Sequence, residues 1–284
     1  MKRLLRAITP AEVERLVAQG CSAESWDEVW VPEQFDIAHV VDVHFSGTVC
    51  LGAFRKSFTL PGGLVRHSGV RHATLHNVTL GDDVLIEQVH NYIANYRIGR
   101  ESIIQHVDLL LVEGRTSFGN NVEVSVLNET GGREVPIYDG LSASLAYLIA
   151  LYRHRPQLIA HLRQLIADYA EHVADTMGTI GERVIIRNAG TIRNVRIGSY
   201  ARVENCTRLE NGSINSKQEA PVFVGDSVIA EDFILSSGSQ VADAAKLIRC
   251  FVGQACHVTH NFSAHDSLLF SNCSFENGEA CAIF

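Results

Sequence analysis

The chain has 284 residues, of which 46% are hydrophobic and 20% are charged, so it can bury a core and does not have the composition of a disordered chain. Its formal net charge is −8, and no run of Lys or Arg is present, which argues against a nucleic-acid-binding protein. No segment approaches the roughly 20 apolar residues of a membrane span.

Arg6 interrupts the N-terminal leucines, so a signal peptide is not expected. The seven cysteines include no CxxC pair, which is typical of reduced thiols. These features indicate a cytoplasmic protein with small-molecule or protein partners and without membrane or nucleic-acid partners.

The first predicted element is a helix over residues 10–18. Thr9 is a typical N-cap residue, Pro10 suits the first turn, and Gly20 follows the end. We expect residues 1–39 to form an N-terminal helix and cap, because the open end of a repeat structure needs covering.

A six-residue repeat follows, on both sides of the middle of the chain. Its unit is an aliphatic residue or Phe, then Gly, two variable residues and a small residue. Seven copies occur: LGDDV (80–84), IGRES (98–102), FGNNV (118–122), IGERV (180–184), IGSYA (197–201), VGDSV (224–228) and VGQAC (252–256). Apolar anchors recur at the same interval, at Leu80, Ile86, Tyr92, Ile98 and Ile104.

A coil of three short strands has this period, whereas a helix repeats every 3.6 residues and a hairpin strand alternates. We expect the anchors to point inward and stack from coil to coil, and the glycine to let the backbone turn a corner. The pattern predicts a mainly β fold, a parallel β-helix in two blocks over residues 40–127 and 179–284.

The repeat stops between the two blocks, where residues 128–178 predict a polar loop and an α-helical hairpin. Residues 141–153 and 156–177 carry apolar side chains at helical spacing. The apolar stripe must pack on the wall of the β-helix or on another subunit. We also expect a homo-oligomer. The chain ends on the apolar sequence CAIF, from which we expect a truncated C-terminus or a covering partner.

Three polar clusters are candidate sites. Five-residue steps between the anchors Val70, Leu75 and Leu80 put His72, Gln88 and His106 in one column. His90 lies two residues after Gln88. A histidine on this wall could be a general base, or the column could be a solvent-facing ladder.

The second cluster is the loop at residues 128–134. Its two glycines would let backbone N–H groups converge on an anion, and Asn128, Glu129 and Arg133 could bind substrate there. The alternative is a flexible connector. The third cluster is His257, His260 and His265, which could bind a metal or form a polar turn.

Several segments resemble an uncharacterised family of long bacterial hexapeptide-repeat proteins. These are NYRIGRESII, SFGNNVEVSVLNETGGREVPIYDGLSA, LAYLIALYRHRPQLI, APVFVGDSVIAEDFILSSGS and CFVGQACHV. The resemblance spans nearly the whole chain and implies a left-handed parallel β-helix. The wider superfamily contains acyltransferases, many of them trimers with active sites between subunits, but no established activity transfers to this chain.

We therefore weigh three hypotheses. The first is an acyl- or acetyltransferase-like enzyme for a sugar, sugar nucleotide or amine, with acyl-CoA as co-substrate. In it His106 or His90 is the base and the loop at 128–133 holds an anionic group. The second is a non-catalytic β-helical scaffold or binding protein. The third, weaker one is a metal-dependent site at His257–His265, although no metal is predicted from the spacing.

Overall fold

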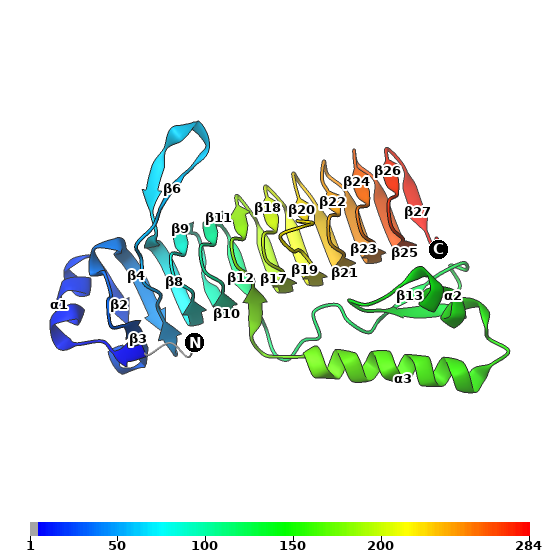
Figure 1. Cartoon of the computed structure of the whole chain (residues 1–284), viewed down its shortest axis with the longest axis horizontal. Helices are drawn as coiled ribbons and strands as arrows, with labels where there is room; N and C mark the ends of the chain where they lie inside the picture. The colour runs from blue at the N-terminus through cyan, green and yellow to red at the C-terminus, as the bar shows by residue number, and fades with distance from the viewer. Residues whose placement is uncertain (1–4) are drawn as a thin grey trace.

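The computed structural model describes residues 5–284, and the fold is mainly β with three α-helices in that range. Most strands belong to one large sheet, in which the chain winds so that each coil lies on the one before it (Figure 1). We call this array of parallel coils the stack.

The strands of the stack form three rows. One row contains β9 (Leu85–Val89), β11 (Ile103–Val107), β16 (Ile185–Arg187), β18 (Arg202–Glu204), β20 (Phe223–Val224), β22 (Gln240–Val241), β24 (His257–Thr259) and β26 (Ser274–Glu276). The other two rows share strands that bend in the middle: β4 (Val40–Ser46), β8 (Gly69–Leu80), β10 (Ile93–Ile98), β17 (Thr191–Ile197), β19 (Arg208–Ile214), β21 (Ile229–Leu235), β23 (Lys246–Val252) and β25 (Ser263–Leu269).

Shorter strands complete these rows: β2 (Ser22–Ala23), β3 (Val29–Pro32), β5 (Val49–Cys50), β12 (Leu109–Leu111), β15 (Gly178–Ile180) and β27 (Glu279–Cys281). Strand β2 pairs in parallel with β4, and β3 pairs with β5. Parallel pairing therefore begins at Ser22, earlier than residue 40, where the sequence pattern places the first block.

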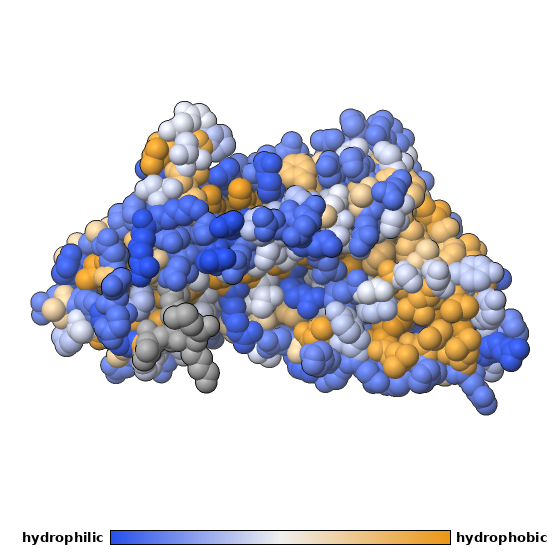
Figure 2. Space-filling view, in the orientation of Figure 1, coloured by the Kyte–Doolittle hydropathy of each residue, from blue (hydrophilic) through white to orange (hydrophobic). Residues whose placement is uncertain are grey.

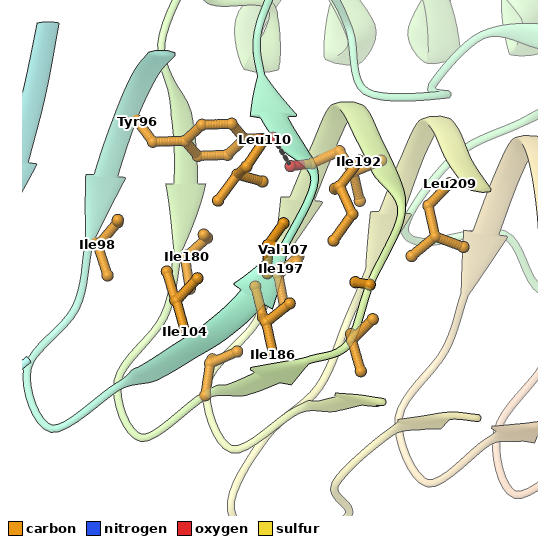
Figure 3. Packing of buried hydrophobic residues seen from close by; sticks show 14 of the residues in the cluster. Tyr96, Ile98, Ile104, Val107, Leu110, Ile180, Ile186, Ile192, Ile197 and Leu209 are labelled. Carbon is orange, nitrogen blue, oxygen red and sulfur yellow. Dashed lines mark hydrogen bonds between the residues drawn. The ribbon is translucent and has the colours of Figure 1, made fainter. Parts of the chain in front are cut away.

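Apolar anchors fill the interior of the stack, where each one lies on the equivalent residue of the neighbouring coil (Figure 3). Ile98 pairs with Ile180, which pairs with Ile197. The Tyr96 hydroxyl crosses this interior and donates a hydrogen bond to the Val195 carbonyl at 2.8 Å. The inward stacking predicted from the repeat is confirmed for these anchors.

Tyr92 is an exception, because its assignment as an inward anchor is wrong. Ile93, and not Tyr92, is in register with Leu75 and Leu110. Ile93 is fully buried, whereas 40% of Tyr92 is exposed. One extra residue separates Ile86 from Ile93, and the step from Ile93 to Ile98 is one residue shorter, so the repeat recovers afterwards. The Tyr92 ring consequently faces outward.

The repeat glycines serve close packing between coils. A Cβ atom added to Gly99 would lie 2.5 Å from the backbone of Gly181, and one added to Gly181 would lie 2.4 Å from the Ser199 nitrogen. Neither glycine has a positive φ. The prediction that glycine occurs here because it lets the backbone turn a corner is therefore wrong for these two residues. Glycine occurs because the neighbouring coil leaves no space for a side chain.

The N-terminal segment covers the first coil. Helix α1 (Pro10–Ala18) has the predicted Thr9 cap and buries Leu16 completely. Strand β1 (Leu5–Ala7) pairs antiparallel with β3. The short 3₁₀ turns η1 (Trp26–Glu28) and η2 (Ile37–His39) connect the first coils. Figure 1 shows α1 at the end of the stack opposite the C-terminus.

Glu12 makes this cap sensitive to acid. Arg6 donates two hydrogen bonds to Glu12, at 2.6 and 2.8 Å, and these bonds lower the pKa of the carboxyl from 4.5 to about 2. A carboxyl with a lowered pKa stabilises the fold above its unfolded pKa, and this contribution is lost as the pH falls towards the folded value. We expect the free energy of unfolding to fall between pH 4.5 and 2 more steeply in the parent chain than in Glu12→Gln. Denaturation curves along this pH range measure the difference.

Glu14→Gln on the same helix is the matched control for this experiment and should keep the parent pH dependence. If Glu12→Gln and Glu14→Gln give the same pH profile, the Arg6 pair does not contribute as described.

An insertion between Leu111 and Gly178 folds back along the outside of the stack (Figure 1). It contains the antiparallel pair β13 (Val122–Ser125) and β14 (Glu134–Ile137), which sequence periodicity does not predict, followed by α2 (Ala143–Leu151) and α3 (Pro156–Val173). The helices lie within the predicted ranges. Their buried residues, with those of the β13–β14 pair, cover Ile234, Phe251 and Leu268 on the outer wall.

A second antiparallel pair, β6 (Ser57–Thr59) and β7 (Val65–His67), also departs from the repeat. The turn η3 (Pro61–Gly63) joins its strands. Figure 1 shows this pair projecting from the stack. Among residues 5–284, no helix has both the length and the apolar character needed to cross a membrane.

Candidate functional site

The predicted column of His72, Gln88 and His106 is present in the structure. Val70 pairs with Ile86, and Ile86 pairs with Ile104, so the residues two positions later are also in register. The column continues through the stack, and all its members except Asp226 have a positive φ: Asp42, His72, Gln88, His106, Asn188, Asn205, Asp243, His260 and Asn277. We call these residues the corner column.

Backbone conformation accounts for the composition of the corner column. A positive φ is unfavourable for most side chains, and Asn, Asp and His tolerate it best. Nδ1 of His72 in addition donates a 2.8 Å hydrogen bond to the Asp42 carboxylate one coil away. His106 has no hydrogen-bond partner among residues 5–284 and is exposed. The positive φ at this corner therefore accounts for the histidines, and no catalytic role is needed to explain them.

This explanation makes a prediction for His106, whose φ is 53°. His106→Asn should leave the free energy of unfolding within about 0.5 kcal/mol of the parent, because Asn tolerates this conformation. His106→Val should cost about 1–2 kcal/mol, because a β-branched residue is strained there. Urea denaturation of the two variants provides the comparison, and equal stabilities would contradict the proposed backbone role.

The side chains next to the corner column are paired with one another. Glu87 accepts hydrogen bonds from Arg71 at 3.1 Å and from Gln105 at 2.8 Å, and Gln105 accepts one from Arg187 at 3.2 Å. This ladder borders a hollow of about 540 Å³ that His72 and His106 also line. His90 instead lines a separate hollow of about 290 Å³.

The predicted anion loop is the tip of the β13–β14 hairpin. Asn128 accepts a hydrogen bond from the Thr130 amide at 3.1 Å, and the Gly132 amide donates to Glu134 at 2.6 Å. The latter bond is the main reason that the pKa of Glu134 is lowered. Glu129 and Arg133 are exposed. The amide groups that would converge on an anion are therefore already used within the turn.

The structure does not bring the loop and the two histidines together. The amide of Leu127, beside the loop, donates to the carbonyl of Ala282 in the last coil. Six coil spacings separate the coil of His106 from that last coil. At ~4.8 Å per spacing the separation along the stack is about 29 Å.

The predicted cluster of His257, His260 and His265 is also dispersed. His260 belongs to the corner column, whereas His257 lies in β24 and His265 in β25, in different rows. No group of three or more His, Cys, Asp or Glu residues within the described range could hold a metal ion.

A larger hollow lies on the outer face of the row that contains β12. It has a volume of about 810 Å³, and Tyr92, Ala94, Leu109 and Leu111 form its apolar middle. Its polar lining comes from Glu24, His44, Ser46, Thr74, His76, Asn95, Glu113, Thr191, Arg193 and Glu210. We call this hollow the Tyr92 groove. Sequence reasoning missed it because it assigned Tyr92 to the interior.

Hydrogen bonds order the histidine end of the Tyr92 groove. The Asn77 amide is oriented by the Thr48 N–H, which donates to its oxygen at 3.0 Å. Its NH₂ group therefore donates to Nε2 of His76 at 2.9 Å, which places the proton of His76 on Nδ1. Nδ1 then donates to Ser46 at 2.7 Å, and Ser46 donates to Glu24 at 2.8 Å. In this arrangement His76 is not a base for Ser46.

Other polar groups of the groove have no partner. Within residues 5–284 no hydrogen bond is made by the side chains of Thr74, Tyr92 or Thr191. His44 uses only Nδ1, which is 2.9 Å from Ser22, so its Nε2 is available. The groove thus offers ordered but unused donors and acceptors around an apolar middle, an arrangement typical of binding sites.

A second hollow, of about 710 Å³, lies between α2 and the last coils and is lined by apolar residues that include Tyr147, Phe270 and Phe284. Figure 2 shows an apolar surface over this part of the molecule. It contains no charged residue in its lining.

These features define a mainly β protein built on a coiled parallel sheet, with an open groove on one face. The chain belongs to the family described as "Domain of unknown function (DUF4954)", whose model matches residues 5–284. It is 25% identical over 256 residues to an uncharacterised protein of Treponema pallidum (strain Nichols), an alignment that covers 84% of this chain and 34% of the relative. The chain spans about a third of the length of that curated relative.

Proposed function

We propose that the chain is a non-catalytic scaffold or binding protein built on a left-handed β-helix of the hexapeptide-repeat type. The observation that supports this most is the spacing of about 29 Å along the stack between the coil of the predicted base, His106, and the last coil, to which Leu127 beside the predicted anion loop is bonded. A general base must lie within hydrogen-bonding reach of the group it deprotonates, so these residues cannot serve one substrate within a single chain.

The fold assignment within this proposal rests on the six repeat copies that lie in the coils and on the register of the coils. The seventh copy, at residues 118–122, lies in the insertion. Gly81 and Gly99 are 18 residues apart, and Gly181 and Gly198 are 17 apart, which fits three short strands per coil. An experimental density map at a resolution that shows the path of the main chain tests the handedness, and a right-handed coil would refute it.

The acyltransferase hypothesis is the rival, and the chemistry of the grooves weighs against it. A CoA donor carries several phosphate charges, whereas the Tyr92 groove is lined by three carboxylates and one guanidinium. The Gly132 amide at the anion loop is already bonded to Glu134. Neither place therefore offers an obvious phosphate site.

An activity assay separates the two proposals. We expect no transfer from acetyl-CoA to a panel of amines, sugars and sugar nucleotides, and no thermal shift with CoA. Because superfamily sites often lie between subunits, the assay uses the chain in its native oligomeric state, which light scattering after gel filtration determines. Turnover that is lost in His106→Ala or His90→Ala would overturn the scaffold proposal.

A further inference from the structure

We propose that the Tyr92 groove binds an extended, basic peptide segment of a partner protein, with apolar residues at its centre. This inference rests on the proposed scaffold function and names the kind of partner. It starts from the shape of the groove, which has a volume of about 810 Å³ and lies across the coils rather than within one of them.

The middle of the groove fits apolar side chains. Tyr92 is 40% exposed, and Leu109 and Leu111 beside it are half-buried, so an apolar surface is left open to water. Aromatic and aliphatic anchors of this kind supply most of the affinity at protein interfaces when a partner covers them.

The charges at the two ends of the groove favour a partner with positively charged side chains. Glu24 lies at one end, and Glu113, Glu210 and Arg193 lie at the other. Glu210 is paired with Arg193 at 2.6 Å and with Arg208 at 3.0 Å, so its charge is offset. Glu113 is 3.6 Å from Arg193 and its side chain is 68% exposed, so Glu113 is the carboxylate that stays open at this end. With neutral histidines the lining residues carry a formal charge of −2. Arg208 beside Glu210 reduces this local charge to −1, which still attracts Lys or Arg and repels phosphate groups. The net charge of −8 on the chain favours the same partners.

The floor of the groove is a sheet face and not a sheet edge. Its backbone N–H and C=O groups are used between coils, as in the pairing of β10 with β12 and of β12 with β17. A bound strand therefore cannot extend the sheet by backbone pairing. The unpartnered side chains of Thr74, Tyr92 and Thr191 and the Nε2 atom of His44 are available instead for the amide and carbonyl groups of a peptide.

The spacing of the end charges sets the length of the segment. Glu24 is in register with Ser46, and three further coil steps lead through His76 and Ala94 to Leu111, which precedes Glu113 by two residues. Four spacings of ~4.8 Å give about 19 Å, which an extended chain at ~3.3 Å per residue covers in about six residues. The partner should therefore carry basic residues about six positions apart, with apolar residues between them.

Fluorescence anisotropy with a defined array of decapeptides tests this pattern on the intact chain. The array contains peptides with lysines six positions apart around an apolar centre, the same compositions with lysines three apart, and versions with glutamate in place of lysine. We expect the tightest binding for the first set, about tenfold weaker binding when the spacing is halved, and no binding of the glutamate versions. Binding of the first set should weaken at high salt.

Matched variants locate the binding site. Tyr92→Ala and Glu113→Gln should each weaken binding about fivefold to tenfold. Tyr147→Ala, which removes a tyrosine of similar exposure (46%) on α2, and Glu182→Gln, which removes an exposed carboxylate outside the groove, should leave it unchanged. Circular dichroism confirms that each variant is folded.

Several results would overturn the inference. These are the absence of binding to every lysine peptide, a preference for the glutamate peptides, and equal effects of Tyr92→Ala and Tyr147→Ala. Binding of a neutral oligosaccharide such as maltohexaose in the groove, without peptide binding, would also refute it. The acyl-transfer assay tests the scaffold proposal and the peptide-binding assay tests this inference. Failure of one is therefore distinguishable from failure of the other.

Discussion

Asp139→Ala is expected to lower the free energy of unfolding by about 3–5 kcal/mol, because it removes the acceptor of a nearly buried ionic network. Asp139 belongs to the insertion and its side chain is 12% exposed. It pairs with Arg196 of the stack, and it accepts hydrogen bonds from Tyr169 of α3 and from Asn215, each at 2.8 Å. Without the carboxylate, the Arg196 guanidinium is left without this partner at the junction of insertion and stack.

Urea denaturation measures the loss, and limited proteolysis reports whether the insertion detaches before the stack unfolds. Glu182→Ala is the matched control, because it breaks an ion pair with Arg100 in which the side chains are 47% and 56% exposed. Such an exposed pair contributes only ~0–1 kcal/mol. Equal losses for the two variants would mean that Asp139 does not anchor the insertion.

Phe251→Ala is expected to lower the free energy of unfolding by about 3–5 kcal/mol, because it opens a cavity between the insertion and the outer wall of the stack. Phe251 is 2% exposed although it lies on the outer side of its coil, where residues of the β13–β14 pair, α2 and α3 cover it. Its ring also contacts Phe270, at 5.6 Å between the ring centroids.

The control for this variant is Leu165→Ala on α3, where the side chain is 52% exposed and no comparable cavity forms. That change should cost less than about 1 kcal/mol. Differential scanning calorimetry supplies both values. A small loss for Phe251→Ala would indicate that the insertion is held mainly by its polar network rather than by apolar packing.

The interior of the stack was largely predictable, for a physical reason. Each coil repeats the same inward positions, so the requirement to bury an aliphatic anchor appears in the sequence at nearly constant spacing. Ile98, Ile180 and Ile197 show this directly. Tyr92 shows the limit of the method, since one extra residue shifts the register and the sequence offers an aromatic and an aliphatic residue side by side.

The outer surface was less predictable, because its side chains obey no repeated packing requirement. The corner histidines resemble a catalytic column in the sequence, but the positive φ at that position explains His72 and His106 as backbone requirements. The available signal was the number of Asn and Asp residues at the equivalent positions of other coils. When these Asn and Asp residues are considered together with the histidines, the column indicates a backbone position with a positive φ and not a set of catalytic residues.

The sequence by itself determined the coiled, mainly β character of this chain, the helix at Pro10 and the two helices of the insertion, because each depends on contacts repeated within a few residues. Only the tertiary structure decided where the insertion packs, that the loop beside Leu127 reaches Ala282, and that Tyr92 faces a groove. These results depend on contacts between residues far apart in the chain and on the choice between two neighbouring residues for one inward position, and local spacing encodes neither.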